Sequence, residues 1–517
     1  MRSEGTGRHV VIVGGGHNGL TSAAYLARAG HRVTVLERLD HVGGAAISAE
    51  AFAGVPARLS RYSYLVSLMP RSIADDLGLS VRLVRRRYSS YTPLPGTDRG
   101  LLIDNRDAAA TAASFASVGA GADAAGFSRF HARTGEVARN LFPTLTRPLP
   151  TESEARALFG ADWGPLVERP IGEAISEAVA SDLVRGVIAT DALIGTFASV
   201  FDAGLEQNRC LLYHVIGQGT GDWDVPIGGM GVVSGGIEAA ARAAGATIVT
   251  GAEVTSVMPD GEVVYRAGDA DHRVGADLVL AGCAPAVLAR LMGEDAPRPQ
   301  GAQVKVNMLL RRLPRLREAG LDPRAAFGGT FHVHESLPEL ERAWAVASGG
   351  EVPDPLPLEI YCHSLADRSI LGAELGEDAQ TLTVFGLHVP DALVDAVGND
   401  ELRSRLQRAV FASLDSVLGE PLEPLLAVDP AGHPCVEVRT TRDLEASLAM
   451  PGGQIFHGPL AWPWAEADEP LDTPACRWGV ATAHERVLLC GAGARRGGGV
   501  SGVGGHNAAM ASLELLG

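Results

Sequence analysis

Three glycines near the start of the chain have the spacing that holds a dinucleotide. Gly14, Gly16 and Gly19 follow the apolar run 10–13 in the pattern G-x-G-x-x-G. The first glycine permits a tight turn, the second lets backbone N–H groups approach a pyrophosphate, and the third lets a helix pack closely on a strand. A helix that begins here directs the positive end of its dipole toward the phosphates.

The residues after these glycines predict a complete strand–helix–strand unit. An alanine-rich helix is expected over 20–29, and a second apolar strand over 33–36 ends at Glu37. Glu37 follows Gly19 by 18 residues, where a carboxylate accepts hydrogen bonds from ribose hydroxyls. Because that carboxylate would repel a 2′-phosphate, the sequence disfavours NADP at this site.

Lys305 is the second candidate for chemistry, because it is the single lysine among 44 basic residues. A lysine amine can lose its proton on burial, whereas an arginine guanidinium remains charged. Lys305 lies in the expected strand QVKVNMLL, on one face with Gln303 and Asn307. A catalytic amine and a buried structural lysine both fit this position.

Other reactive residues do not form a recognisable site. The six cysteines are far apart with no C-x-x-C pair, which argues against structural zinc and a dithiol centre. His332 and His334 are expected to share one face of a strand, but no third ligand has a metal-site spacing, so no metal is predicted. His457 is expected either to face the ligand cavity or to make a structural hydrogen bond.

The composition favours a protein that binds small molecules. A net charge of −17 argues against nucleic acid as a partner, and the cluster 85–87 of three arginines is expected on the solvated surface or in internal ion pairs. No apolar run is long enough for a membrane span. Peripheral contact with a membrane is still compatible with the sequence. The sequence has no apolar signal region, and we expect a cytoplasmic protein of undetermined oligomeric state.

The order of the expected elements predicts a discontinuous α/β fold of two domains. The nucleotide-binding domain is expected to comprise residues 1–70, 226–300 and 481–517, and an inserted domain residues 71–225 and 301–480. Partly alternating apolar stretches favour an antiparallel sheet in the inserted domain, over 303–310, 358–362 and 381–388. Residues 71–225 are expected to mix amphipathic helices with loops. The glycine-rich loop 491–505 lies between an apolar strand and a helix, which favours close backbone approach to a ligand.

Three motifs in this order resemble FAD-dependent oxidoreductases of the phytoene desaturase and amine oxidase superfamily. They are the N-terminal unit with Gly43-Gly44, the middle segment GGMG, and the terminal LLCGAG…GGGVSG…HNAA. The sequence is most similar to the branch called pyridine nucleotide-disulphide oxidoreductase domain-containing protein 2. The resemblance implies a discontinuous Rossmann-type FAD-binding domain and an inserted α+β substrate domain.

The resemblance also implies roles for individual residues. Gly14, Gly16 and Gly19 would hold the FAD pyrophosphate, and Glu37 the adenosine ribose. Val254 would contact the adenine through its backbone, and Lys305 would hold a water beside flavin N5. The other cofactor contacts would be Arg38, Gly43, Gly44, Ala45, Gly491, Gly493, Gly502 and Val503.

Two departures from the superfamily pattern bear on function. Amine oxidases usually read G-G-R where this chain has Gly44-Ala45-Ala46, and T-H-P where it has Ala494-Arg495-Arg496. The expected activity is hydride removal from a C–H bond of an apolar small molecule, with reoxidation by O2 or a quinone. The alternatives are an amine or amino-acid oxidase, and a flavin-binding interaction protein with little catalysis.

Overall fold

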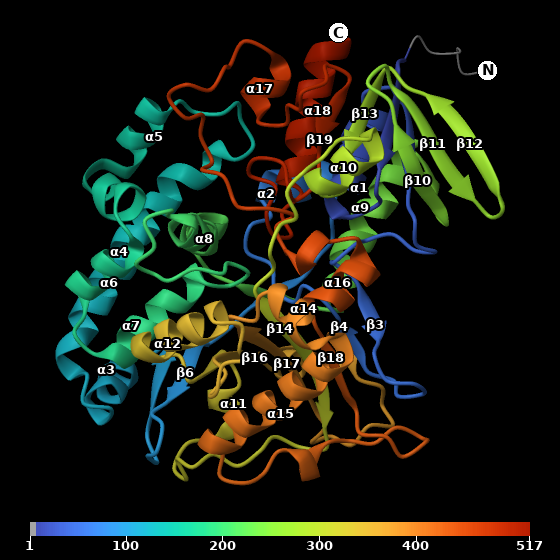
Figure 1. Ribbon diagram of the computed structural model, residues 1–517. Coiled ribbons are helices and arrows are strands. Elements are labelled where there is room, and N and C mark those ends of the chain that lie inside the picture. Colours follow the sequence, from blue (N-terminus) through green and yellow to red (C-terminus); the bar gives the residue numbers. More distant parts are fainter. Residues whose placement is uncertain (1–6) are drawn as a thin grey trace.

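The first apolar strand of the chain forms the centre of a five-stranded sheet in the computed structural model, which describes residues 7–517. All neighbouring strands in this sheet are parallel, in the order β19-β13-β1-β2-β9. The strands are β1 (His9–Val13), β2 (Arg32–Leu36), β9 (Thr247–Val249), β13 (Leu278–Ala281) and β19 (Val487–Leu489). Segments from the beginning, middle and end of the sequence therefore lie side by side in one sheet (Figure 1).

Both faces of the parallel sheet are covered, which explains why residues 10–13 of β1 are all apolar. Val10 and Ile12 belong to a core shared with three helices, α1 (His17–Arg28), α9 (Met230–Ala244) and α18 (Val503–Leu516). Val11 and Val13 face the opposite way, into a core shared with a three-stranded antiparallel sheet. The strands of that sheet are β10 (Ala252–Val257), β11 (Glu262–Ala267) and β12 (Ala270–Gly275).

A second large sheet has seven strands in the order β18-β14-β17-β16-β15-β6-β7. They are β6 (Tyr88–Pro93), β7 (Gly100–Asp104), β14 (Gln303–Leu310), β15 (Thr330–Val333), β16 (Leu358–Tyr361), β17 (Gln380–Leu387) and β18 (Val436–Arg439). Every pair is antiparallel except β15 with β6. The expectation of helices and loops over 71–225 was incomplete, since β6 and β7 extend this sheet.

The two faces of the seven-stranded sheet differ in chemistry. On one face, Val304, Val306 and Ile360 pack with the apolar side of α15 (Asn399–Val417). The other face carries polar residues, among them Lys305 and Glu359, and lines a cavity. This alternation follows from the two-residue period of strands.

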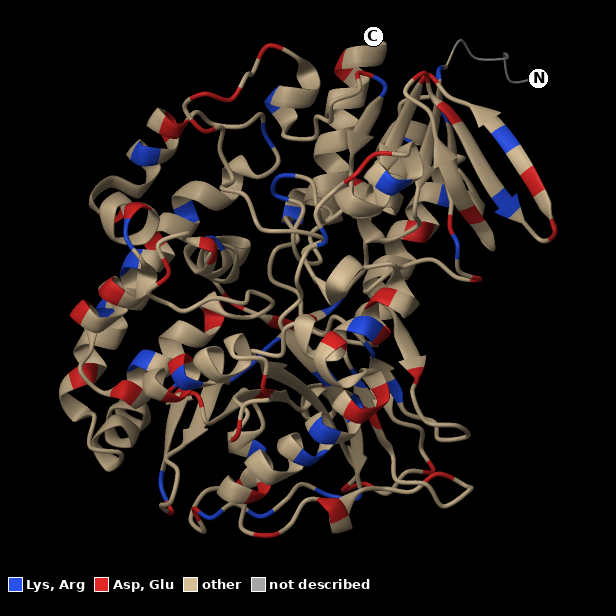
Figure 2. Cartoon of the chain, in the orientation of Figure 1, with Lys and Arg blue, Asp and Glu red and all other residues tan. Residues whose placement is uncertain are grey.

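Helices between β7 and β8 cover the remaining side of the cavity, in teal and green in Figure 1. They are α3 (Ala108–Ser117), α4 (Ala124–Leu141), α5 (Glu152–Phe159), α6 (Ile171–Ala178), α7 (Asp182–Ala189) and α8 (Glu206–Val215). Figure 2 shows basic and acidic residues interspersed over these outer helices.

The remaining strands and helices lie between these parts of the fold. The strands are β3 (Ser48–Glu50), β4 (Arg58–Ser60), β5 (Leu83–Arg85) and β8 (Asp224–Pro226). The helices are α2 (Arg71–Leu77), α10 (Pro285–Met292), α11 (Pro323–Ala326), α12 (Leu337–Ser348), α13 (His363–Ala366), α14 (Ala392–Val397), α16 (Thr441–Leu448) and α17 (Pro474–Trp478). Within residues 7–517, no helix combines the length and apolar character that crossing a membrane requires.

Candidate functional site: a cavity between the two large sheets

A cavity of about 1420 Å³ joins the parallel sheet to the polar face of the seven-stranded sheet. At its nucleotide end it is lined by residues at the carboxyl ends of parallel strands, including Val13, Leu36, Gly282 and Gly491. Ligands of open α/β sheets bind at this edge.

The glycine turn after β1 is shaped for a phosphate group. Gly14 has a φ of +96°, and α1 begins at His17 without a side-chain cap at Gly16. A side chain at Gly16 would enter open space, whereas one at Gly19 would clash with the carbonyl oxygen of Gly14. The uncapped first turn of α1 can therefore donate backbone N–H groups to an anion in the cavity.

Glu37 is positioned at this end by two backbone hydrogen bonds. Its Oε2 accepts from the N–H of Gly15 at 2.7 Å, and its Oε1 accepts from the N–H of Leu39 at 2.8 Å. Each carboxylate oxygen has a second lone pair, so Glu37 can still accept hydrogen bonds from a ligand hydroxyl. The neighbouring Arg38 also lines the cavity and donates to the carbonyl of Ser447 at 2.9 Å.

The chain after β2 returns to the glycine turn. The N–H of Gly43 donates to the carbonyl of Gly15 at 2.8 Å. Gly43 has a φ of +115°, and an added side chain would lie 2.9 Å from Ser234 Oγ. Gly44, Ala45 and, from β10, Val254 line the cavity.

Near the end of the chain, only one of the four residues expected to contact the cofactor lines the cavity. Gly491 lines the cavity, together with Ala492, Gly499 and Val500. Three expected contacts, Gly493, Gly502 and Val503, are not among the lining residues. Gly493 packs against Pro285, Gly502 precedes the first residue of α18, and Val503 is fully buried.

Lys305 projects from β14 into the middle of the cavity. Its Nζ donates to the carbonyl of Tyr62 at 2.8 Å and lies 3.8 Å from the ring centroid of Tyr64. Desolvation lowers the pKa of Lys305 well below its ordinary range, and the nearby charge of Glu437 opposes that shift only in part. Lys305 is thus an amine that loses its proton more readily than an exposed lysine, held by a carbonyl and an aromatic face.

A row of side chains crosses the sheet from Lys305. The strand register places Lys305 opposite Phe385, Phe385 opposite Glu359, and Glu359 opposite His332. All four line the cavity. With neighbouring strands roughly 5 Å apart, the row is roughly 14 Å long.

The far end of this row is a buried cluster of acids and histidine. His332 Nδ1 hydrogen-bonds to Glu335, while Glu359 accepts from the Tyr361 hydroxyl at 2.7 Å and from the Thr190 hydroxyl at 3.3 Å. Burial raises the pKa of Glu359 to about 8 and that of Glu335 well above its ordinary range. Near pH 7 the Glu359 carboxyl therefore favours the neutral form.

The expectation that His332 and His334 share a strand face was wrong. β15 ends at Val333, and His334 has a φ of +54° and instead contacts Glu339 and Ser416. His332 lies with Glu335 and Glu359, whose ligand atoms are all within 4.8 Å of one another, a set that could hold a metal ion. The sequence signal for Glu359 is an acidic residue inside the apolar strand LEIYC.

Two further histidines line the cavity near the terminal loop. His17 Nε2 lies 3.2 Å from the carbonyl oxygen of Gly499, and His457 Nδ1 is buried without a hydrogen-bond partner within residues 7–517. Burial lowers the pKa of each to about 4. Both rings are therefore neutral at pH 7.

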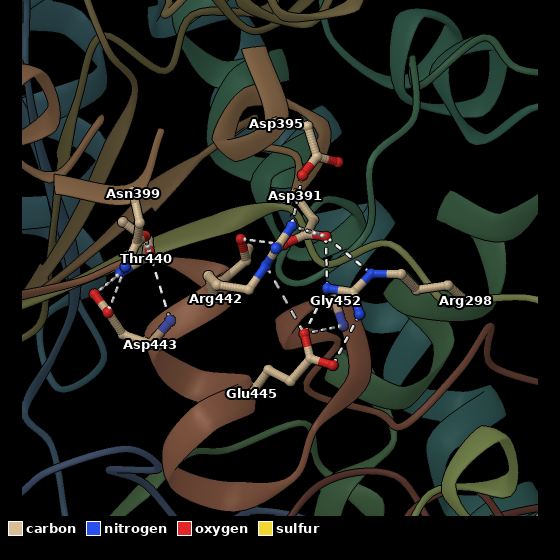
Figure 3. Close-up of polar contacts among 10 residues, drawn as sticks. Arg298, Asp391, Asp395, Asn399, Thr440, Arg442, Asp443, Glu445 and Gly452 are labelled. Carbon is tan, nitrogen blue, oxygen red and sulfur yellow. Dashed lines mark hydrogen bonds and ion pairs between the residues drawn. The ribbon is translucent and has the colours of Figure 1, made fainter. Parts of the chain in front are cut away.

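An ion-pair network fixes the position of α16, which forms part of the cavity wall (Figure 3). Arg298 donates to Asp391 at 2.9 Å and to Glu445 at 2.8 Å, and Arg442 also pairs with Asp391. Glu445 lies on α16 and lines the cavity. The network joins the linker before β14 to α14 and α16, and so fixes α16 beside the nucleotide end.

The arginines that replace the T-H-P motif serve packing. Arg496 is fully buried and donates to the carbonyls of Thr144 at 2.9 Å and Arg147 at 2.7 Å. Arg495 bonds to the carbonyls of Trp462 and Trp464, two stacked, buried rings. None of these four side chains lines the cavity, so this segment anchors the loop to the helical region.

Comparisons with known proteins agree with this architecture. Residues 12–73 match the model of the NAD(P)-binding Rossmann-like domain. The chain is 56% identical to an uncharacterized protein of Mycobacterium tuberculosis, over 98% of this chain and 97% of the relative. It is 29% identical to mouse pyridine nucleotide-disulfide oxidoreductase domain-containing protein 2, over 96% of this chain and 92% of the relative.

Among solved structures, putrescine oxidase bound to putrescine has a TM-score of 0.55 at 18% identity, covering 98% of this chain and 99% of its own. Cyclohexylamine oxidase from Brevibacterium oxydans has a TM-score of 0.53 at 14% identity, covering 98% and 100%. These two likenesses concern the fold. With the family model and the full-length relatives, the chain belongs to the superfamily of FAD-dependent oxidoreductases that includes amine oxidases, and it is similar over nearly its whole length to pyridine nucleotide-disulfide oxidoreductase domain-containing protein 2.

Proposed function

We propose that this flavin-dependent oxidoreductase binds FAD and acts as a dehydrogenase or desaturase on a largely apolar small molecule. The observation that carries the proposal is the single cavity, which runs from the glycine turn and Glu37 to Lys305 and continues to the polar row of the sheet. An FAD molecule is long enough to need such a continuous path. When bound, the flavin would accept a hydride from a substrate C–H bond and be reoxidised by O2 or a quinone.

The residues at the nucleotide end fit FAD. Uncapped N–H groups at the start of α1 would bind the pyrophosphate, with Gly14, Gly16 and Gly19 allowing the approach. Glu37 would accept from the ribose hydroxyls, since it retains free lone pairs. The other contacts would come from Arg38, Gly44, Ala45, Val254 and Gly491, and we place Gly43, Gly493, Gly502 and Val503 behind the lining as support.

Lys305 is the residue that we assign to proton transfer. Its lowered pKa lets the amine take up or release a proton, and its bond to Tyr62 fixes the direction of Nζ. Apolar walls from Phe115, Phe127, Val187 and Ile194 suit a lipophilic substrate body.

The test is anaerobic reduction of the purified, flavin-loaded protein. We expect a flavin absorbance spectrum that is bleached by an apolar C–H donor from a substrate panel and restored by O2 or a quinone. Bleaching by amines or amino acids alone would establish the oxidase alternative. A protein that neither contains flavin nor takes it up refutes the proposal, and a bound flavin that no panel member reduces favours a flavin-binding interaction protein.

A further inference from the structure

Arg86 differs from the two arginines beside it. Arg85 pairs with Asp222 and Asp224, and Arg87 pairs with Asp104. Arg86 lies in the connection between β5 and β6 and lines the cavity, and within residues 7–517 no carboxylate oxygen lies within 4.0 Å of it. The expectation that this cluster is solvated or internally paired was therefore wrong for Arg86.

Two hydrogen bonds hold the Arg86 guanidinium in place and leave part of it free. Nε donates to the carbonyl of Trp223 at 3.2 Å, and Nη1 donates to the Thr330 hydroxyl at 3.0 Å. Within the described residues, Nη2 makes no hydrogen bond. The guanidinium carbon lies 5.9 Å from the ring centroid of Tyr361, so the group is oriented before any ligand arrives.

No acid near Arg86 forms an ion pair with it within residues 7–517. The charges of Glu359, Asp191 and Asp224 act on the guanidinium from a longer distance. Glu359 is hydrogen-bonded to Tyr361 and Thr190, and Asp224 pairs with Arg85. The free Nη2 of Arg86 is therefore available to a ligand in the cavity.

We propose that Arg86 binds a carboxylate group of the substrate, with the apolar body of that substrate extending along the cavity. A guanidinium pairs with a carboxylate through parallel N–H···O bonds. Because Arg86 supplies one unpaired positive charge, a monoanion matches this end better than a doubly charged phosphate. The inference rests on the proposed function, and it names the substrate class as amphipathic carboxylic acids.

The experiment compares four eight-carbon ligands by isothermal titration calorimetry with the flavin-loaded protein at pH 7. We expect octanoate to bind at least tenfold more tightly than octanamide, octylamine or octyl phosphate. Arg86→Gln should weaken octanoate binding by about 10- to 100-fold, the range for a hydrogen bond to a charged group. The same variant should change octanamide binding less than threefold, and Arg86→Lys should restore part of the preference.

Arg82→Gln serves as the matched control, because Arg82 is an exposed arginine of the same segment that does not line the cavity. It should bind octanoate as the parent protein does. Equal affinity for all four ligands, tightest binding of the amine or the phosphate, no binding of octanoate, or an unchanged preference in Arg86→Gln would each overturn the inference. The flavin spectrum of the same samples reports on the proposed function separately, since it does not depend on Arg86.

Discussion

At the scale of single residues, burial changes the acid–base character of Lys305. Its pKa is lowered because the ammonium form loses hydration, while the carbonyl of Tyr62 and the ring of Tyr64 keep the amine in one place. Lys305→Met keeps the length of the side chain and removes the proton-carrying nitrogen. We expect turnover or flavin reoxidation to fall by roughly 10²-fold, as for loss of a positioned acid–base group.

Stopped-flow absorbance after anaerobic reduction would measure the reoxidation of Lys305→Met. The flavin content of the variant serves as the control. Unchanged turnover and reoxidation with normal flavin content would assign Lys305 to packing alone.

Glu359 should make the stability of the protein depend on pH. Burial raises its pKa from 4.5 to about 8, so between these values the folded state binds more protons than the unfolded state. The stabilisation is complete below about pH 4.5 and is lost as the pH rises toward 8. The glutamine of Glu359→Gln does not titrate. Between pH 6 and pH 8.5, the unfolding free energy of the parent should therefore fall by at least about 1 kcal/mol more than that of the variant.

Urea unfolding at the two pH values would measure this difference. Glu377→Gln, which changes an exposed carboxylate, should follow the parent profile. Identical pH profiles for Glu359→Gln and the parent would contradict the raised pKa.

Residue types that act through local spacing could be predicted from the sequence. The glycine turn and Glu37 lie within one short segment, and Lys305 stood out by its rarity. Arg86 could not be distinguished from Arg85 and Arg87, because only the tertiary contacts show which of the three lines the cavity.

At the scale of elements, we expect two glycines at the start of α1 to contribute differently, Gly16 to cofactor binding and Gly19 to folding. The space beside Gly16 is open, whereas Gly19 touches the backbone of Gly14. Gly16→Ala should therefore fold normally but lose flavin, since its methyl group enters the space of the pyrophosphate. Gly19→Ala should lower the free energy of unfolding by about 1–3 kcal/mol through overpacking.

Thermal unfolding and flavin absorbance of the two variants would separate these effects. Gly235→Ala, in α9 with open space around it, is the matched control and should leave flavin binding intact. Full flavin content in Gly16→Ala would show that the glycine turn is not part of the cofactor site.

The predicted fold class is confirmed, but the elements were not equally visible in the sequence. β1, α1 and β2 carry strong apolar patterns, and β14 and β17 were recognised for the same reason. β6 reads YSSYTP, with serine, threonine and proline in place of an apolar pattern, and it becomes a strand because β15 and β7 pair with it. Pairing between strands that are far apart in the sequence produces no pattern in the local sequence of β6.

At the scale of the whole molecule, flavin should act as a structural ligand. The cavity lining comes from distant parts of the chain, including 13–19, 36–45, 252–254 and 491–500. A ligand that contacts all of them binds only the folded state, and at 100 times its Kd it adds about 2.7 kcal/mol to stability. We expect FAD to raise the midpoint of thermal unfolding of the flavin-depleted protein by a few degrees.

Differential scanning calorimetry with and without FAD would measure this shift. Gly16→Ala should show no increase, because it cannot bind the pyrophosphate. Equal midpoints for the parent protein with and without FAD would contradict assembly of the nucleotide site around the cofactor.

The place of β19 and α18 in the fold also sets an order of events during protein synthesis. β19 is an edge strand of the parallel sheet, and α18 packs on α1, where Ser22 Oγ donates to the carbonyl of Gly505 at 2.8 Å. The ribosome makes the glycine turn near the beginning of translation but its packing partner only after some 490 further residues. We therefore expect the cofactor to be loaded after translation, and a chain that ends before residue 505 should fail to acquire flavin.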